Sequence, residues 1–139
     1  MELKMTIAEV TAFLEKVFPQ IDNDFTVVSL SVDEVVVRMN VQTRHLRPGG
    51  TVSGPAMFAL ADVSYYIATL ALIGPEALTV TTNCSIDFMR KPAATDMIAK
   101  ARVLKLGRTL SVGDVLLYSI GQAAPVARAN LTYSIPQNR

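Results

Sequence analysis

An almost wholly apolar run extends from Gly54 to Gly74 and limits the folds that this chain can adopt. The run is about long enough to cross a bilayer. It carries Asp62 near its middle, however, where a charge in a membrane would cost about 3 kcal/mol on insertion scales. A helix enclosed at the centre of a globular domain accounts for the same pattern without that cost. The run therefore predicts a buried central helix.

The ends of this run carry helix start and stop signals. Ser53 is a good N-cap, and Pro55 is tolerated in the first turn, where its missing N–H costs nothing. Gly74 and the proline after it end the helix, which we expect to reach about Leu72. A shorter helix is predicted near the amino terminus, because Thr6-Ile-Ala-Glu9 has the form of a capping box before apolar residues at helical spacing.

The remaining segments alternate apolar and polar residues with a period of two, which is typical of half-buried strands. The predicted strands cover residues 25–31, 34–41, 80–88, 97–106, 109–119 and 127–135. Residues 43–52, which include Pro48, Gly49 and Gly50, are predicted to form a loop. The short connections between the later strands predict antiparallel neighbours.

The architecture follows from the burial of the central helix. A helix that is apolar nearly all round must be enclosed on most sides. An antiparallel sheet with one apolar face encloses it by curving around it. The sequence therefore predicts an α+β hotdog fold, with a long central helix wrapped by a curved antiparallel sheet and a short amino-terminal helix, in one domain over residues 1–139.

Charge and composition narrow the possible partners. The formal net charge of +1 argues against a large surface for nucleic acid. The single Cys84 and single His45 cannot form an internal disulfide or a zinc cluster. Residues 1–4 lack the apolar core of a secretory signal, so we expect a cytoplasmic location.

Several motifs, in this order along the chain, resemble those of the PaaI-like acyl-CoA thioesterases. They are Ser-Gly-Pro-Ala-Met-Phe-Ala-Leu-Ala-Asp at residues 53–62, Thr-Thr-Asn at 81–83 and Phe-Met-Arg-Lys-Pro at 88–92. The resemblance extends from Val35 to Ile135. It implies a hotdog fold, hydrolysis of acyl-CoA or aryl-CoA thioesters without a metal or cofactor, and assembly into homodimers or homotetramers.

The same resemblance implies roles for three residues. Gly54 matches the glycine whose backbone N–H polarises the thioester carbonyl, Asp62 matches the general base or nucleophile, and Thr81 matches a hydroxyl residue that holds the attacking water.

Many members carry His-Gly-Gly where this chain has Ser53-Gly54-Pro55, and their upstream polar residue falls near Arg47. A non-catalytic acyl-CoA-binding or regulatory protein is therefore the alternative. A hotdog hydratase ranks behind it, because it would need an Asp/His pair.

Chemistry supports these roles without the resemblance. A helix amino terminus such as that at Gly54 offers free N–H groups and a partial positive charge, which suit a developing oxyanion. Asp62 is the only acid in the apolar helix, and carboxylates are rarely buried unpaired. Eight residues separate Gly54 from Asp62, or about 12 Å along the axis. An aspartate side chain cannot close that gap, so the spacing predicts a site shared across a two-fold dimer.

Plainer interpretations stay open for individual residues. Asp62 could be a structural carboxylate that caps a loop or pairs with Arg47. Strict alternation places Thr81 on the face opposite Cys84, so its catalytic role needs a bulge or a position at the sheet edge. Cys84 is predicted to be core packing and His45 to be a surface residue.

A further group of residues is predicted to bind the acyl-CoA substrate: Ser53, Arg47, Tyr66, Asn83, Arg90 and Lys91. Arg90 and Lys91 end the strand that starts near Thr81 and have the charge that suits the CoA phosphates, although sheet surfaces also commonly carry such residues for solubility. Tyr66 follows Asp62 by about one turn, where it could line an acyl pocket or simply pack in the core.

Overall fold

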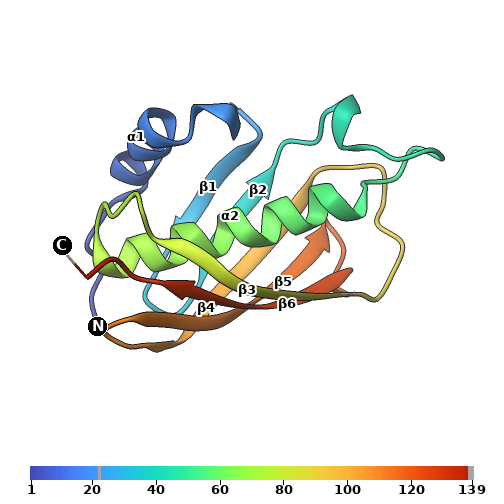
Figure 1. Ribbon diagram of the computed structural model, residues 1–139. Helices are drawn as coiled ribbons and strands as arrows, with labels where there is room; N and C mark the ends of the chain where they lie inside the picture. Colours follow the sequence, from blue (N-terminus) through green and yellow to red (C-terminus); the bar gives the residue numbers. More distant parts are fainter. Residues whose placement is uncertain (22, 138–139) are drawn as a thin grey trace.

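The computed structural model describes residues 1–21 and 23–137, and it has the architecture predicted above (Figure 1). The long helix α2 (Gly54–Ile73) lies across a curved sheet, and the short helix α1 (Ile7–Val17) lies beside one edge of it. Two short 3-10 turns, η1 (Pro19–Ile21) and η2 (Thr43–His45), complete the helical elements of the described chain.

The sheet has six strands in the order β1-β2-β4-β5-β6-β3, and all neighbouring strands are antiparallel. Their bounds are β1 Phe25–Leu30, β2 Val35–Met39, β3 Val80–Phe88, β4 Met97–Leu106, β5 Leu110–Ser119 and β6 Ala127–Ser134. The expectation that successive strands are neighbours holds for β4–β5 and β5–β6 but is wrong for β3–β4. The eight residues of 89–96 exceed a usual hairpin loop, and they carry the chain across to β4 beside β2.

Helix α2 is the centre of the core. It is long and apolar enough to cross a membrane by length and composition, yet 78% of its most apolar window is buried inside the fold. The sheet encloses it with inward side chains such as Val35, Val37 and Met39, which alternate with half-buried neighbours along β2. Burial of this apolar surface drives the wrapping of the sheet around the helix.

The predicted helix ends are confirmed. The Ser53 hydroxyl accepts from the Ala56 N–H at 3.2 Å, and Gly54 is the first helical residue. Gly74 ends the helix with a φ of 97°, a backbone conformation that favours glycine. In α1 both hydrogen bonds of the capping box between Thr6 and Glu9 are present, at 3.0 and 3.2 Å.

Strand β3 lies at an edge of the sheet and contains a bulge. Thr81 is opposite Tyr133 of β6 and Asn83 is opposite Thr132, so Thr82 is an extra residue in the pair. The extra residue reverses the alternation, because it adds one step to a period of two. Thr81 therefore faces the helix together with Cys84, and the prediction of strict alternation along β3 is corrected here.

Candidate active site

Asp62 lies on α2, half-buried, and its carboxylate is bound by two hydroxyl groups. The Thr81 hydroxyl donates to Asp62 Oδ1 at 2.7 Å, and the Tyr133 hydroxyl lies 2.6 Å from the same oxygen. The Tyr133 hydroxyl also lies 2.9 Å from the backbone carbonyl oxygen of Asp62. Within the described chain Oδ2 accepts no hydrogen bond, so one carboxylate oxygen is anchored and the other is available.

The bulge and the sheet order bring these groups together. Thr81 on β3 and Tyr133 on β6 are directly opposite each other, and both point toward α2. The sequence predicted a role for Thr81 only if β3 had a bulge there or lay at the sheet edge, and both features are present. It did not identify Tyr133. The available signal was an inward-facing tyrosine in the last strand, because a buried tyrosine hydroxyl usually has a polar partner.

Aromatic rings surround the Tyr133 side chain, which is buried. Its ring centroid lies 5.6 Å from that of Tyr65 and 6.1 Å from that of Tyr66. The Tyr65 hydroxyl is hydrogen-bonded to the Ser111 hydroxyl at 2.8 Å, and burial raises the pKa of Tyr65 to about 12. Burial, reinforced by the charge of Asp62, also raises the pKa of Tyr133. Both phenols are therefore protonated at neutral pH.

The alternative in which Asp62 pairs with Arg47 does not agree with the structure. Among the ion pairs of residues 1–21 and 23–137, none includes Asp62. Arg47 is exposed in the loop before α2. Its backbone carbonyl and N–H close a turn with Gly50 and Thr51. The carboxylate is instead held by neutral hydroxyl donors, which leave its negative charge uncompensated by a cation.

Gly54 is the first residue of α2, and it lies next to the end of β3. A Cβ atom placed on Gly54 would be 3.5 Å from Cζ of Phe88, so the Phe88 ring stands beside the helix start. As the first helical residue, Gly54 has no backbone acceptor four residues earlier within the helix. Strand β3 therefore lies along α2. Thr81, near the start of the strand, is beside Asp62, and Phe88, at its end, is beside Gly54.

The other predicted substrate-binding residues fall into two groups. Ser53 adjoins Gly54, while Arg90 and Lys91 follow β3 just beyond Phe88 and are exposed. One guanidinium nitrogen of Arg90 donates to the Pro125 carbonyl at 2.7 Å.

The second group lies toward the Asp62 end. Tyr66 is buried, and its hydroxyl donates to the Ala77 carbonyl at 3.1 Å. Asn83 is exposed, on the side of β3 opposite Cys84. The structure thus places Tyr66 near Asp62 and turns Asn83 away from it.

Cys84 agrees with its interpretation as core packing. It is half-buried against the hydrophobic core. Burial, together with the nearby charge of Asp62, raises the pKa of its thiol. A thiol that stays protonated is a poor nucleophile, so the side chain acts here as a small apolar group.

The prediction that His45 is a surface residue is wrong. Its ring is buried: Nδ1 accepts from the Gln42 N–H at 2.8 Å and Nε2 lies 3.3 Å from the Asp24 carboxylate. The His45 carbonyl also accepts from the Ser53 N–H at 2.8 Å, which fixes the loop that leads into α2. Asp24 lies 21 residues away in sequence, so no local spacing could reveal this partner.

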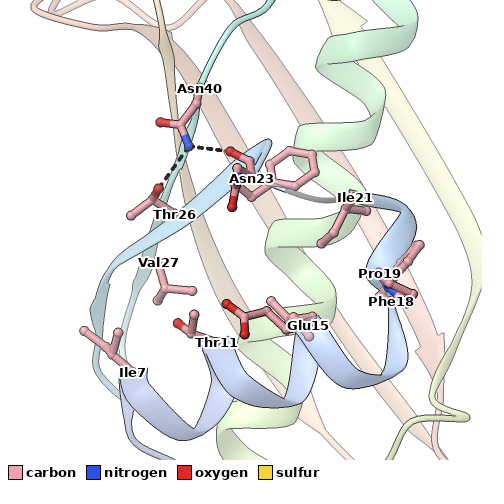
Figure 2. Close-up of a pocket in the computed structure, with 12 residues that line it drawn as sticks. Ile7, Thr11, Glu15, Phe18, Pro19, Ile21, Asn23, Thr26, Val27 and Asn40 are labelled. Atoms are coloured by element: carbon pink, nitrogen blue, oxygen red, sulfur yellow. Dashed lines mark hydrogen bonds between the residues drawn. The ribbon is translucent and has the colours of Figure 1, made fainter.

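A cavity of about 530 Å³ lies elsewhere, between α1, η1 and β1. Figure 2 shows Glu15 and Thr11 of α1 on one side and Asn40 on the other, where the Asn40 amide donates to Asn23 and Thr26. None of the candidate site residues lines this cavity. Among the described residues, no group of three His, Cys, Asp or Glu side chains could hold a metal ion.

Comparison with known proteins gives a consistent result. Residues 49–126 match the family model of the thioesterase superfamily. A search of curated proteins finds no match. Among solved structures, a presumed thioesterase from a Silicibacter species is 60% identical, with a TM-score of 0.91 and coverage of 98% of this chain and 95% of that one.

Two more distant structures agree. A mutant of the phenylacetic acid degradation protein PaaI from Thermus thermophilus is 28% identical, with a TM-score of 0.72 and coverage of 85% of this chain and 99% of that one. Zebrafish thioesterase superfamily member 2 is 24% identical, covers 96% and 100% of the two chains with a TM-score of 0.83, and supports the fold alone.

Proposed function

Because the chain belongs to the thioesterase superfamily, we propose that it hydrolyses an acyl-CoA or aryl-CoA thioester at a site built around Asp62. The observation that supports this most directly is the carboxylate itself. It is the only acid of the core helix, one of its oxygens is anchored by two hydroxyl groups, and the other is available. The second requirement is a hydrogen-bond donor for the thioester carbonyl. The free N–H groups at the start of α2 supply it.

The reaction consumes one water and needs no other reactant. Asp62 Oδ2 takes a proton from water while the water oxygen attacks the carbonyl carbon, and the negative charge that develops on the carbonyl oxygen is stabilised by the Gly54 N–H. The tetrahedral intermediate then collapses. Its C–S bond breaks, the sulfur leaves with the electron pair, and the proton held by Asp62 is transferred to it, so the products are a carboxylic acid and CoA.

The position of Thr81 suits the water that attacks. Its hydroxyl hydrogen is directed to Asp62 Oδ1, so its oxygen can still accept a hydrogen bond. A water that donates to Asp62 Oδ2 and to Thr81 Oγ1 would have both hydrogens engaged. Its lone pairs would then face away from these acceptors, toward a bound carbonyl carbon.

A single chain does not complete this site. Gly54 and Asp62 are separated by about 12 Å along α2, so we propose that the Gly54 N–H of one protomer acts with Asp62 of its partner. Strand β3 offers a free edge for this pairing. Large apolar side chains are exposed on and around it: Leu78 (81%), Val80 (56%), Phe88 (52%), Met89 (44%) and, on α2, Phe58 (40%).

The proposed substrate contacts lie near the two ends of β3. We propose that Arg90 and Lys91 bind CoA phosphates beside Gly54, with Ser53, Arg47 and Asn83 nearby in the assembled dimer. Tyr66, which packs against Tyr133 close to Asp62, is the proposed wall of the acyl pocket.

The test is release of free CoA thiol from a panel of acyl-CoA and aryl-CoA esters. Asp62→Asn should lower turnover about a hundredfold or more, because it removes the proton acceptor while keeping the shape of the side chain. The same substitution at Asp33, which is exposed in the turn between β1 and β2, is the control and should leave turnover unchanged.

Two other outcomes would contradict the proposal. Turnover that survives in Asp62→Asn would remove this residue from the chemistry. Binding of CoA esters by the unmodified protein without release of thiol would instead favour the binding or regulatory protein, the alternative that the missing helix-start histidine raises.

A further inference from the structure

Tyr133 makes the shortest hydrogen bond to Asp62, yet the proposed reaction gives it no part. Its hydroxyl lies 2.6 Å from Asp62 Oδ1 and 2.9 Å from the Asp62 carbonyl oxygen. Both acceptors belong to one residue, so this hydroxyl ties the side chain of Asp62 to its own backbone. An aspartate carboxylate otherwise rotates broadly about its last torsion.

The surroundings of Tyr133 hold this hydroxyl in place. The residue is 3% exposed and lies on β6, opposite Thr81 of β3 on one side and Ser111 of β5 on the other. The rings of Tyr65 and Tyr66 pack against its ring. A tyrosine enclosed by two strands and two aromatic rings cannot swing its hydroxyl away from Asp62.

The hydroxyl also stays a hydrogen-bond donor. Burial and the charge of Asp62 raise the pKa of Tyr133, so its proton is not lost at neutral pH. Thr81 donates to the same oxygen. Oδ1 therefore accepts from two hydroxyl groups, of which that of Tyr133 makes the shorter contact, and this makes it the poorer proton acceptor of the two carboxylate oxygens.

We propose that Tyr133 is a positioning residue that, together with Thr81, fixes Oδ1 of Asp62 and so makes Oδ2 the oxygen that receives the proton from water. This inference rests on the proposed function of Asp62 as the base. Without the Tyr133 hydroxyl, a single bond from Thr81 remains, and the carboxylate spends less time with Oδ2 directed at the water. Tyr133 itself does not contact the substrate, so its effect is on kcat and not on KM.

The variant that tests this is Tyr133→Phe, which removes the hydroxyl and keeps the ring. We expect kcat for CoA release to fall about tenfold or more, because a hydrogen bond to a charged group is lost, while KM changes by less than about twofold. Tyr65→Phe is the matched control. It removes another buried hydroxyl from the same aromatic cluster, one that is bonded to Ser111 and not to Asp62. Its kcat should stay near that of the unmodified protein.

The split between kcat and KM provides a readout that a merely structural role would not move. A general loss of folded protein would lower the active fraction in both Tyr133→Phe and Tyr65→Phe, whereas loss of the hydroxyl that anchors Asp62 should lower kcat in Tyr133→Phe alone.

The outcomes separate this inference from the function on which it rests. Turnover that survives in Asp62→Asn would contradict the proposed function. An inactive Asp62→Asn protein together with an unchanged kcat in Tyr133→Phe would overturn the inference alone, and so would equal losses of kcat in Tyr133→Phe and Tyr65→Phe. If Tyr133→Phe does not fold, 3-fluorotyrosine at position 133 serves instead. Its more acidic hydroxyl is a stronger donor to Asp62 Oδ1 and should change kcat while KM stays the same, and an unchanged kcat would overturn the inference.

Discussion

Thr81 and Tyr133 are opposed residues of neighbouring strands, and their hydroxyl groups lie within 2.7 Å and 2.6 Å of the same oxygen of Asp62. The arrangement depends on one extra residue, Thr82, which turns Thr81 toward the helix. Three elements that are distant in sequence, α2, β3 and β6, therefore meet at one carboxylate. The bulge is the local device that makes this possible, because a regular strand would have turned Thr81 outward.

Removing the Thr81 hydroxyl should weaken catalysis without unfolding the protein. Thr81→Val keeps the shape of the side chain and removes the donor to Asp62, so we expect kcat to fall about tenfold or more. Thr82→Val is the matched control, because the next residue is exposed and its hydroxyl bonds the Thr132 carbonyl. Steady-state rates of CoA release compare the two. Equal effects of the two substitutions would argue that strand stability, and not the hydroxyl of Thr81, is responsible.

Two inactive variants should restore activity when they share a dimer. Asp62→Asn lacks the proposed base, and Gly54→Val would fill the space between the helix start and Phe88, where a Cβ already comes within 3.5 Å of the ring. In a mixed dimer one of the two sites would have both original residues. In the isolated mixed dimer, we therefore expect about half of the normal turnover.

Co-expression with two affinity tags isolates the mixed dimer for this measurement. Each variant purified alone is the control and should be inactive. A mixed dimer that forms but shows no turnover would mean that Gly54 and Asp62 do not act across the interface.

The ion pair between Arg38 and Asp96 should make stability depend on pH in the acid range. Burial alone would raise the pKa of Asp96, but hydrogen bonds from Arg38 at 2.5 and 2.9 Å and from the Val41 N–H at 2.9 Å outweigh it and hold that pKa below its usual value. A carboxyl whose pKa is lower in the folded state stabilises the fold above its unfolded pKa. That contribution is lost as the pH falls through the folded value.

Asp96→Asn should therefore lower the free energy of unfolding by about 1 kcal/mol at pH 7, since the pair is partly exposed. The difference from the unmodified protein should shrink below about pH 4. Urea unfolding at fixed protein concentration measures the free energy of unfolding of both proteins, at pH 7 and below about pH 4. An equal loss at both pH values would show that Asp96 acts through something other than its charge.

Gly113 should be intolerant of any side chain. A Cβ atom at this position would lie 2.0 Å from the Arg102 carbonyl oxygen and 2.7 Å from the Tyr65 hydroxyl. The first of these atoms belongs to the backbone and cannot move aside. We expect Gly113→Ala to cost about 3 kcal/mol or more, and thermal unfolding measures this loss. Gly107→Ala, whose nearest new contact would be 3.4 Å away, should be close to neutral. A neutral Gly113→Ala would mean that β5 can shift relative to β4.

Local sequence patterns were sufficient to predict where the helices and strands of this fold lie. Helix α2 follows from an apolar run bounded by an N-cap serine and a glycine, and its near-complete burial requires an enclosing sheet. The capping box at Thr6 correctly placed α1. These signals act over a few residues, so they are readable from the order of the residues alone. The resemblance to the PaaI-like thioesterases, carried by residues 53–62, 81–83 and 88–92, agreed with the family match.

The helices and strands, the enclosed helix and Asp62 as the unusual acid within it could all be predicted from the order of the residues. The pairing of β3 with β6 and not β4, the contact of Tyr133 with Asp62 and the burial of His45 beside Asp24 became visible in the folded chain. The difference lies in sequence separation. Asp62 and Tyr133 are 71 residues apart, and a contact over such a distance depends on strand order and register, which no local propensity encodes.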